Sequence, residues 1–160
     1  MVKIITDTTA GLSDRVAQCY GIPVIPQVII FGEDSYLEGQ EIDHATFMER
    51  LTTSSELPKT SAPPPELFVE TFQRLVPQGE PILCIHPSTE LSGTVRSATV
   101  AASDFPDADI RVIDTRVIGS ALATMVTLAA QGAEADLDAD TIEARLRDMI
   151  PRSRVYFLVA

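Results

Sequence analysis

Three short apolar segments, each followed by a polar turn and a helical pattern, constrain the fold of this chain more than any other feature. Residues 2–6 read VKIIT, residues 81–85 read PILCI and residues 110–114 read IRVID. Apolar strands that alternate with helices are typical of a parallel sheet with helices on both faces. We therefore predict an α/β fold with a mostly parallel sheet.

The helices expected between these strands begin at recognisable capping residues. Ser13 and Asp43 fit the N-cap position, where a side-chain oxygen accepts a hydrogen bond from a backbone N–H group. The predicted helices cover residues 14–20, 44–51, 66–76, 93–103, 118–131 and 140–150.

Three further segments are less regular. Residues 22–31 (IPVIPQVIIF) are strand-like, but Pro23 and Pro26 favour a sheet edge or an irregular extended segment. Residues 52–65 are predicted to form a polar, proline-rich loop whose last prolines suit the first turn of a helix. Residues 155–159 are predicted to form a final strand.

Composition excludes several classes of function. The 160 residues, 45% of them apolar, are enough for one domain with a real core. The net charge of −11 and the small number of Lys and Arg residues, 12, argue against nucleic-acid binding, which needs clustered cations. The same charge argues against a site on an anionic membrane surface.

Cysteine usage and hydropathy indicate where the protein resides. Cys19 and Cys84 lie in segments predicted to face the core, so buried thiols are expected rather than a disulfide. Residues 1–9 lack the long apolar core of a signal peptide. The uncharged stretch 117–133 is short for a membrane span and carries polar residues, which favours a buried helix. We expect a soluble, cytoplasmic protein without stable membrane insertion.

Hydroxyl-rich turns follow all three predicted strands. Ile5 leads into TDTTAGLS, Ile85 into HPSTELSGT and Ile113 into DTRVIGS. In open α/β sheets, ligands bind beyond the carboxyl ends of the strands, and helix starts there present N–H groups that suit an anion. A single loop of this kind is explained as well by an ordinary helix cap at Ser92. The repetition, together with the hydroxyl pair at residues 60–61, favours a ligand site.

An enzyme site is the alternative. The chain contains no GxGxxG, GxxxxGK[ST] or GxSxG motif, so common nucleotide and hydrolase fingerprints are missing. His86 with Ser88 or Ser92 can be imagined as base and nucleophile, oriented by Asp7 or Asp114. The same side chains also suit structural roles, as turn caps and as a partner of local backbone groups. The two histidines lie far apart in the sequence, and no metal site is predicted.

Four motifs carry a resemblance to a known family. Together with the YGIPVIPQVIIFG pattern at residues 20–32, their order and spacing resemble the DegV family of bacterial fatty-acid-binding proteins. The motifs are ITDTTAGL (5–12), LPKTSAPPP (57–65), HPSTELSGT (86–94) and RVIDT (111–115).

This resemblance implies an α/β lobe that holds a long-chain fatty acid, with the carboxylate bound by hydroxyls and the tail buried. The carboxylate-binding roles in that family fall on Thr60 and Ser92, with Gly93 and Thr94 as neighbours through the loop backbone. No catalytic residue, metal or cofactor is implied. The predicted ligand-binding site comprises Thr60, Ser61, His86, Ser92, Gly93 and Thr94.

The resemblance also implies a partner and an incomplete pocket. Some family members are the acyl carriers of a bacterial fatty acid kinase, whose separate catalytic subunit phosphorylates the bound carboxylate. Residues 1–160 match a single N-terminal lobe, and the family's second lobe has no counterpart. The chain is therefore expected to be either a fragment or a natural short form, and to self-associate.

Two classes of function follow from the sequence. The first is a lipid-binding module that presents a fatty acid to a kinase. The second is an enzyme acting on a small phosphorylated or carboxylated metabolite through Asp7, His86 and Asp114. An apolar tunnel continuing from Ser92 favours the first, and a shallow polar pocket on which those three side chains converge favours the second.

Overall fold

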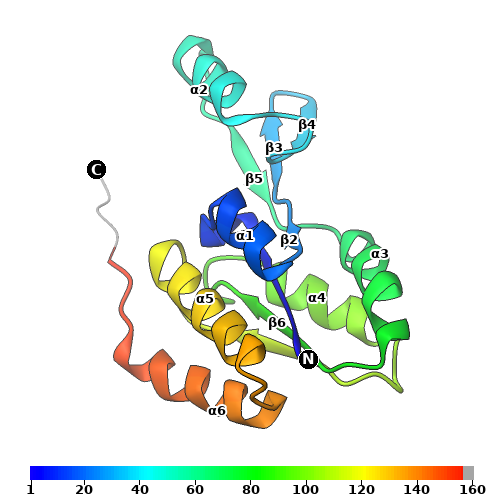
Figure 1. The fold of residues 1–160 in the computed structure, drawn as a ribbon. Coiled ribbons are helices and arrows are strands. Elements are labelled where there is room, and N and C mark those ends of the chain that lie inside the picture. The colour runs from blue at the N-terminus through cyan, green and yellow to red at the C-terminus, as the bar shows by residue number, and fades with distance from the viewer. Residues whose placement is uncertain (157–160) are drawn as a thin grey trace.

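A parallel four-stranded sheet forms the centre of the molecule in the computed structural model, which describes residues 1–156 (Figure 1). The strand order is β2-β1-β6-β7, and every pairing is parallel. The bounds are β1 Lys3–Asp7, β2 Val24–Ile25, β6 Ile82–His86 and β7 Ile110–Asp114. The predicted α/β class is confirmed, and β2 lies at the sheet edge, as its flanking prolines indicated.

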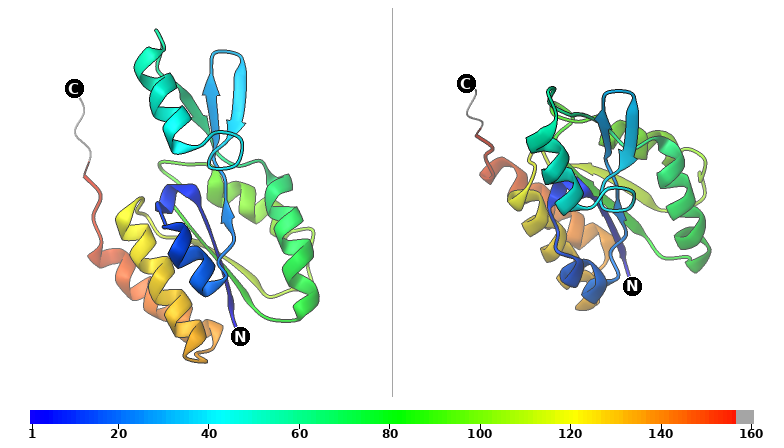
Figure 2. Two further views of the ribbon diagram at one scale, coloured as in Figure 1. Left: turned by 45° about the horizontal axis from the view of Figure 1, so that its top comes forward. Right: turned by 90° about the horizontal axis from the view of Figure 1, so that it is seen from above.

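Helices cover both faces of this sheet (Figures 1 and 2). On one face α5 packs on β1 and β6, and α1 and α6 pack against α5. On the other face α3 and α4 pack together, and α4 lies on β6 and β7. The helices are α1 Asp14–Tyr20, α3 Pro65–Leu75, α4 Thr94–Ala102, α5 Ser120–Glu134 and α6 Ala139–Met149, with 3-10 turns at Thr8–Ala10, Val76–Gln78 and Ile150–Arg152.

Alternating strand residues supply the two cores. Leu83 and Ile85 enter the cluster beneath α5 and α6, whereas Ile82 and Cys84 enter the cluster beneath α3 and α4. Successive side chains of a strand point to opposite faces, so a strand buried on both sides must be apolar throughout. This requirement explains why residues 81–85 are continuously apolar.

A small antiparallel sheet projects from the main sheet beyond the carboxyl end of β2 (Figures 1 and 2). Its order is β4-β3-β5, and it carries α2 (His44–Thr53). The strands are β3 Val28–Phe31, β4 Asp34–Leu37 and β5 Lys59–Ser61. Prediction of residues 52–65 as a loop was wrong for β5, and β4 was not predicted. Both are short and polar, and they become strands by pairing with apolar β3 rather than through a pattern of their own.

Aromatic contacts join α2 to this small sheet. The rings of Phe47 and Phe31 lie 6.0 Å apart between centroids, and the guanidinium of Arg50 lies 4.8 Å from the centroid of the Tyr36 ring. Arg50 Nη1 also donates a hydrogen bond of 2.9 Å to the Tyr36 hydroxyl. These contacts position α2 over one face of the small sheet.

The predicted helix starts are confirmed at two places and corrected at one. The Ser13 and Asp43 side chains accept hydrogen bonds from Val16 N and Thr46 N, as N-caps do. In α4 the N-cap is Gly93, and Ser92 lies one residue before it. Ser92 is not the N-cap residue, but its hydroxyl oxygen still accepts a hydrogen bond of 3.3 Å from the N–H of Thr94, the first residue of α4.

Three other expectations have mixed outcomes. Cys84 is a buried free thiol as predicted, but Cys19 is exposed, because the short helix α1 turns it toward solvent. Residues 155 and 156 are not in a strand, and the rest of the strand predicted at 155–159 lies outside the described residues. Within residues 1–156, no helix has the length and apolar character needed to cross a membrane.

Candidate functional site

The strands β1, β6 and β7 end at Asp7, His86 and Asp114, at one edge of the parallel sheet. His86 and Asp114 are paired in register, and the pairing of β1 with β6 brings Asp7 beside His86. Parallel strands direct their carboxyl ends to the same edge, which is where α/β proteins bind ligands. The predicted convergence of the three loops at this edge is confirmed.

Asp7 and His86 form a buried pair at this edge. His86 Nδ1 lies 2.7 Å from Asp7 Oδ2, and both side chains are fully buried. The edge of the Phe68 ring packs against the imidazole at 5.3 Å between centroids, and His86 Nε2 has no hydrogen-bond partner among the described residues. Because both side chains are buried, neither can directly contact a ligand at this edge of the sheet.

Asp7 is held as an anion despite its burial. Burial alone raises the pKa of a carboxyl group, but hydrogen bonds from His86 and Thr9 outweigh it and leave the pKa of Asp7 below its ordinary value. Thr9 donates to Asp7 Oδ1 through its backbone N–H at 2.9 Å and through its hydroxyl at 2.5 Å. Asp7 therefore acts as a pure hydrogen-bond acceptor.

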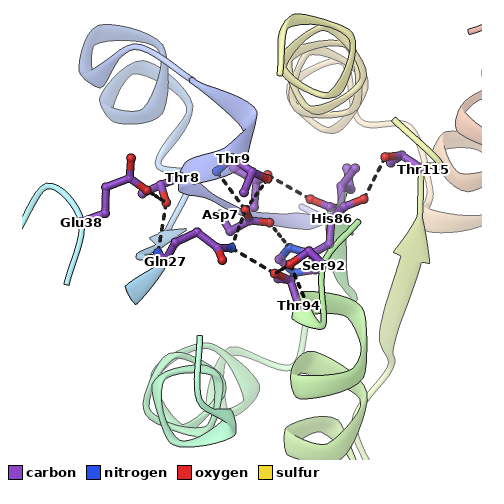
Figure 3. A network of polar contacts seen from close by, with 11 residues as sticks. Asp7, Thr8, Thr9, Gln27, Glu38, His86, Ser92, Thr94 and Thr115 are labelled. Carbon is purple, nitrogen blue, oxygen red and sulfur yellow. Dashed lines mark hydrogen bonds and ion pairs between the residues drawn. The ribbon is translucent and has the colours of Figure 1, made fainter. Parts of the chain in front are cut away.

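A chain of hydrogen bonds runs from Asp7 to the Ser92 hydroxyl (Figure 3). Gln27 Nε2 lies 3.1 Å from Asp7 Oδ1 and 3.0 Å from Thr94 Oγ1, and Thr94 Oγ1 lies 2.8 Å from Ser92 Oγ. Thr94 is fully buried, whereas Ser92 is half-buried. Ser92 is thus the outer end of a polar network that begins at His86.

Asp114 does not join the Asp7–His86 pair. Its Oδ2 accepts a hydrogen bond of 2.7 Å from the Thr89 hydroxyl, and its Oδ1 accepts one of 2.9 Å from Arg116 N. Both carboxylate oxygens are used within the neighbouring loops, as expected for a residue that caps a turn. The arrangement of Asp7, His86 and Asp114 required by the enzyme hypothesis is not assembled.

The Thr60–Ser61 pair lies on β5 and is exposed. The next residue, Ala62, contacts the Ser92–Gly93 turn, because a Cβ added to Gly93 would lie 3.4 Å from the Cβ of Ala62. The end of the Thr-Ser segment therefore approaches the Leu-Ser-Gly-Thr motif through Ala62, although the two segments are about thirty residues apart in the sequence. A side chain at position 93 would touch Ala62, so Ala62 closes this side of the turn.

An apolar cavity of about 340 Å³ lies beside this segment, between the first strand's turn and the small sheet with α2. Ile29 lines it, and Ile29 is the cross-strand partner of Thr60, so their side chains share one face of the small sheet. Ser92 is not among the lining residues. The apolar lining consists of Leu12, Val24, Ile29, Ile42 and Phe47, and the polar lining includes Thr8, Asp14, Glu38, Asp43 and His44.

The sequence-based analysis missed two members of this region. Gln27 links Asp7 to Thr94, and Glu38 accepts a hydrogen bond from the Thr8 hydroxyl. A lone glutamine between two apolar extended segments was the only local signal for Gln27. Among residues 1–156, no group of three His, Cys, Asp or Glu side chains is arranged to hold a metal ion.

These features define a parallel α/β domain with a hydroxyl-rich polar site at its carboxyl edge and an apolar cavity close by. The model of the DegV family, described as "Uncharacterised protein, DegV family", matches residues 1–160. The chain belongs to the DegV family.

Relatives by sequence include DegV domain-containing proteins of Clostridium perfringens and Halalkalibacterium halodurans. The first is 36% identical over 91% of this chain and 52% of its own length, and the second is 36% identical over 99% and 56%. The chain thus spans about half the length of the curated relatives it matches.

Solved structures of the family share the fold. A DegV fatty-acid-binding protein from Bacillus subtilis has a TM-score of 0.87 at 28% identity, over 94% of this chain and 54% of that one. A DegV protein from Thermus thermophilus, described by its fatty acid binding, has a TM-score of 0.85 at 27% identity over 94% and 53%. A stearic-acid-binding protein from Eubacterium ventriosum has a TM-score of 0.83 at 27% identity, over 92% and 52%.

Proposed function

We propose that this chain binds a long-chain fatty acid, with the carboxylate between Thr60 and Ser92 and the tail against the apolar cavity. The observation that supports the proposal is the position of Ala62, the residue after the exposed Thr60–Ser61 pair, next to Gly93. Ile29, the cross-strand partner of Thr60, lines the cavity and so links the pair to it. The fatty acids named for the Bacillus subtilis and Thermus thermophilus relatives support the same ligand.

The head group is bound by neutral donors in this proposal. The hydroxyls of Thr60 and Ser92 and the backbone at Gly93 contact the carboxylate, and Thr94 and buried His86 contribute indirectly through the polar network. Ser61 follows Thr60 on β5, so its side chain points to the opposite face of the strand. Hydroxyls and amides neutralise a carboxylate less than Lys or Arg does, so its oxygens stay nucleophilic. That property suits an acid that is to be phosphorylated.

The tail supplies most of the affinity. Each buried methylene contributes about 0.8 kcal/mol before binding costs are subtracted, so a dozen outweigh the ~1 kcal/mol of each neutral hydrogen bond. The acidic side chains of Asp14, Glu38 and Asp43 at the cavity repel a carboxylate. The charged end of the ligand therefore stays outside, toward Thr60, and the cavity receives methylene groups.

We further propose that the bound acid is presented to the catalytic subunit of a fatty acid kinase in the cytoplasm, and that this chain performs no chemistry itself. The separation of Asp114 from the buried Asp7–His86 pair supports a non-catalytic role. No cofactor is part of the proposal; the fatty acid is the ligand.

Substitution of the two hydroxyl residues tests the ligand site. In the full-length protein, Thr60→Ala and Ser92→Ala are each expected to weaken fatty-acid binding by roughly 1 kcal/mol or more, because each removes a hydrogen bond to a charged group. A fluorescent fatty-acid titration measures the affinity, and thermal denaturation followed by circular dichroism is expected to change little.

Thr99→Ala is the matched control, because the Thr99 hydroxyl is exposed on α4 and bonds only the carbonyl oxygen of Val95. Its fatty-acid affinity is expected to equal that of the wild type. Unchanged affinity in both Thr60→Ala and Ser92→Ala removes these hydroxyls from the site and contradicts the proposal.

A further inference from the structure

Gln27 is a buried side chain that, together with Thr94, connects the Asp7–His86 pair to the proposed head-group site. It lies between β2 and β3, and its side-chain nitrogen bridges Asp7 Oδ1 and Thr94 Oγ1 at 3.1 and 3.0 Å (Figure 3). Its backbone N–H donates to Thr8 Oγ1 at 3.0 Å, which holds the residue in place. Only 6% of its surface is exposed, so Gln27 acts on a ligand through other residues.

The direction of the hydrogen bonds at Gln27 follows from Asp7. The Asp7 carboxylate is an acceptor only, and Oδ1 already receives the Thr9 N–H. The amide group of Gln27 must therefore turn its nitrogen, and not its oxygen, toward Asp7. An amide NH₂ has two hydrogens, so one goes to Asp7 and the other to Thr94.

The direction of the hydrogen bond between Thr94 and Ser92 follows from the donor at Gln27. Thr94 Oγ1 is buried and accepts from Gln27, which leaves its single hydrogen to be satisfied. Within the described residues, Ser92 Oγ, at 2.8 Å, is the only other atom in hydrogen-bond contact with Thr94 Oγ1. The Thr94 hydroxyl therefore donates to Ser92, and the backbone N–H of Thr94 points at the same oxygen from 3.3 Å.

Ser92 can act toward a ligand only as a hydrogen-bond donor. Its oxygen accepts from Thr94, and its own hydrogen has no acceptor among residues 1–156, so at this half-buried position the hydrogen is available to a ligand. We propose that Gln27 is a positioning residue that, through Thr94, holds the Ser92 hydroxyl as a donor and so makes the site prefer a carboxylate to a neutral head group on the same tail. This inference rests on the proposed fatty-acid function.

Substitution of Gln27 removes the donor that fixes the direction of the hydrogen bond between Thr94 and Ser92. Without the amide donor, the hydrogen bond between Ser92 and Thr94 can run either way. When Ser92 donates to Thr94, a carboxylate meets the lone pairs of Ser92 and is repelled. A primary alcohol donates to or accepts from Ser92 equally well, because a hydroxyl does both.

The affinities of hexadecanoic acid and 1-hexadecanol for the full-length, delipidated protein test this inference. Both are measured by displacement of a fluorescent fatty acid at a pH where the acid is ionised. Gln27→Met, which keeps the length of the side chain but has no N–H donor, is expected to weaken acid binding roughly tenfold, since hydrogen bonds to a charged group are of that strength. Alcohol binding is expected to change much less, so the acid-to-alcohol ratio falls.

Variants of Thr94 show whether the effect passes through that residue. Thr94→Val removes the oxygen to which Ser92 would donate when it turns inward, so its ratio is expected to stay near the wild-type value. The double variant is expected to regain the ratio that Gln27→Met loses, because the effect of Gln27 passes through the Thr94 oxygen. Thr94→Ser keeps the hydroxyl and is the conservative control, with a ratio near the wild-type value. Thermal denaturation identifies any variant that does not fold, and Gln27→Leu, which also lacks an N–H donor, carries the test if Gln27→Met is one.

The outcomes separate this inference from the proposed function. A wild-type protein that prefers the acid, together with an unchanged ratio in Gln27→Met, overturns the role of Gln27 and leaves the proposed function standing. A double variant whose ratio stays as low as that of Gln27→Met overturns the path through Thr94 in the same way. An equal loss of acid and alcohol affinity also overturns it, because that result indicates a structural role only. A wild-type protein that binds neither ligand overturns the proposed function and this inference with it.

Discussion

At the residue scale, Asp7 is the side chain on which the polar network depends. It accepts hydrogen bonds from Thr9 and Gln27 and contacts His86, all in the interior. Removing one partner of a buried charged group costs more than a surface contact contributes, because the remaining groups stay desolvated. Asp7 therefore stabilises the fold and the site together.

Asp7→Asn is expected to lower the free energy of unfolding at neutral pH by about 1–3 kcal/mol, the range for hydrogen bonds to a charged group. The pKa of Asp7 in the folded state lies below its ordinary value of 3.8, so between the two pKa values the unfolded chain binds more protons. The contribution of Asp7 is thus complete above that ordinary value and is lost as the pH falls through the folded-state pKa.

Chemical denaturation of both proteins over a series of pH values measures this difference. The difference in free energy of unfolding between wild type and Asp7→Asn is expected to decrease steadily as the pH becomes acidic. Asp107→Asn is the control, because that carboxylate is exposed and makes no hydrogen bond or ion pair among residues 1–156. A difference in free energy of unfolding that does not change with pH contradicts the stabilising role of the Asp7 charge.

At the element scale, the small sheet and α2 form a unit whose stability is local. The small sheet contacts α2 mainly through aromatic rings: Phe31 packs against Phe47, and Tyr36 packs against Arg50. The main sheet, in contrast, is buried between two clusters of apolar side chains. Elements with few buried contacts open at lower free energy than the core.

Phe47→Ala is expected to lower the opening free energy of β3 and β4 by about 1–2 kcal/mol, less than the cost of deleting a fully buried phenylalanine. Hydrogen exchange measures it, with the amides of β6 expected to keep their protection. Met48→Ala, at the exposed next position, is the matched control and is expected to leave exchange unchanged. Equal loss of protection in β3 and β6 contradicts a separate unit.

At the scale of the whole molecule, the small sheet has an edge next to the proposed head-group site that is unpaired within residues 1–156. β5 pairs only with β3, so its other edge is free among the described residues, and Thr60 and Ser61 on it are exposed. A free strand edge is a surface on which another chain can pair. In relatives of about twice this length, the additional chain is available to cover such a surface.

The 160-residue chain is therefore expected to self-associate, and to bind a long-chain fatty acid more weakly than the same protein extended to the length of its relatives. Analytical ultracentrifugation measures the association, and a fluorescent fatty-acid titration measures the affinity. A monomeric 160-residue chain that binds the acid tightly and stoichiometrically contradicts this expectation and shows that one lobe suffices.

Local patterns in the sequence determined the elements of the main fold. The apolar runs at 81–85 and 110–114 predicted buried parallel strands, because burial on both faces leaves no room for polar residues. Ser13 and Asp43 marked helix starts, because capping needs only a side-chain oxygen within a few residues of the N–H group. The motifs around Thr60 and Ser92 marked the candidate site, through their resemblance to a family.

Tertiary structure decided what no local pattern contains. β5 is a strand only because β3 offers it an edge. Asp114 is the cross-strand partner of His86, yet its carboxylate does not bond the imidazole, because Thr89 and Arg116 N use its two oxygens. Gln27 became part of the site by meeting Asp7 and Thr94, which lie 20 and 67 residues away. Short-range sequence encodes backbone preference and burial, whereas hydrogen-bond partners this distant are chosen only when packing brings them together.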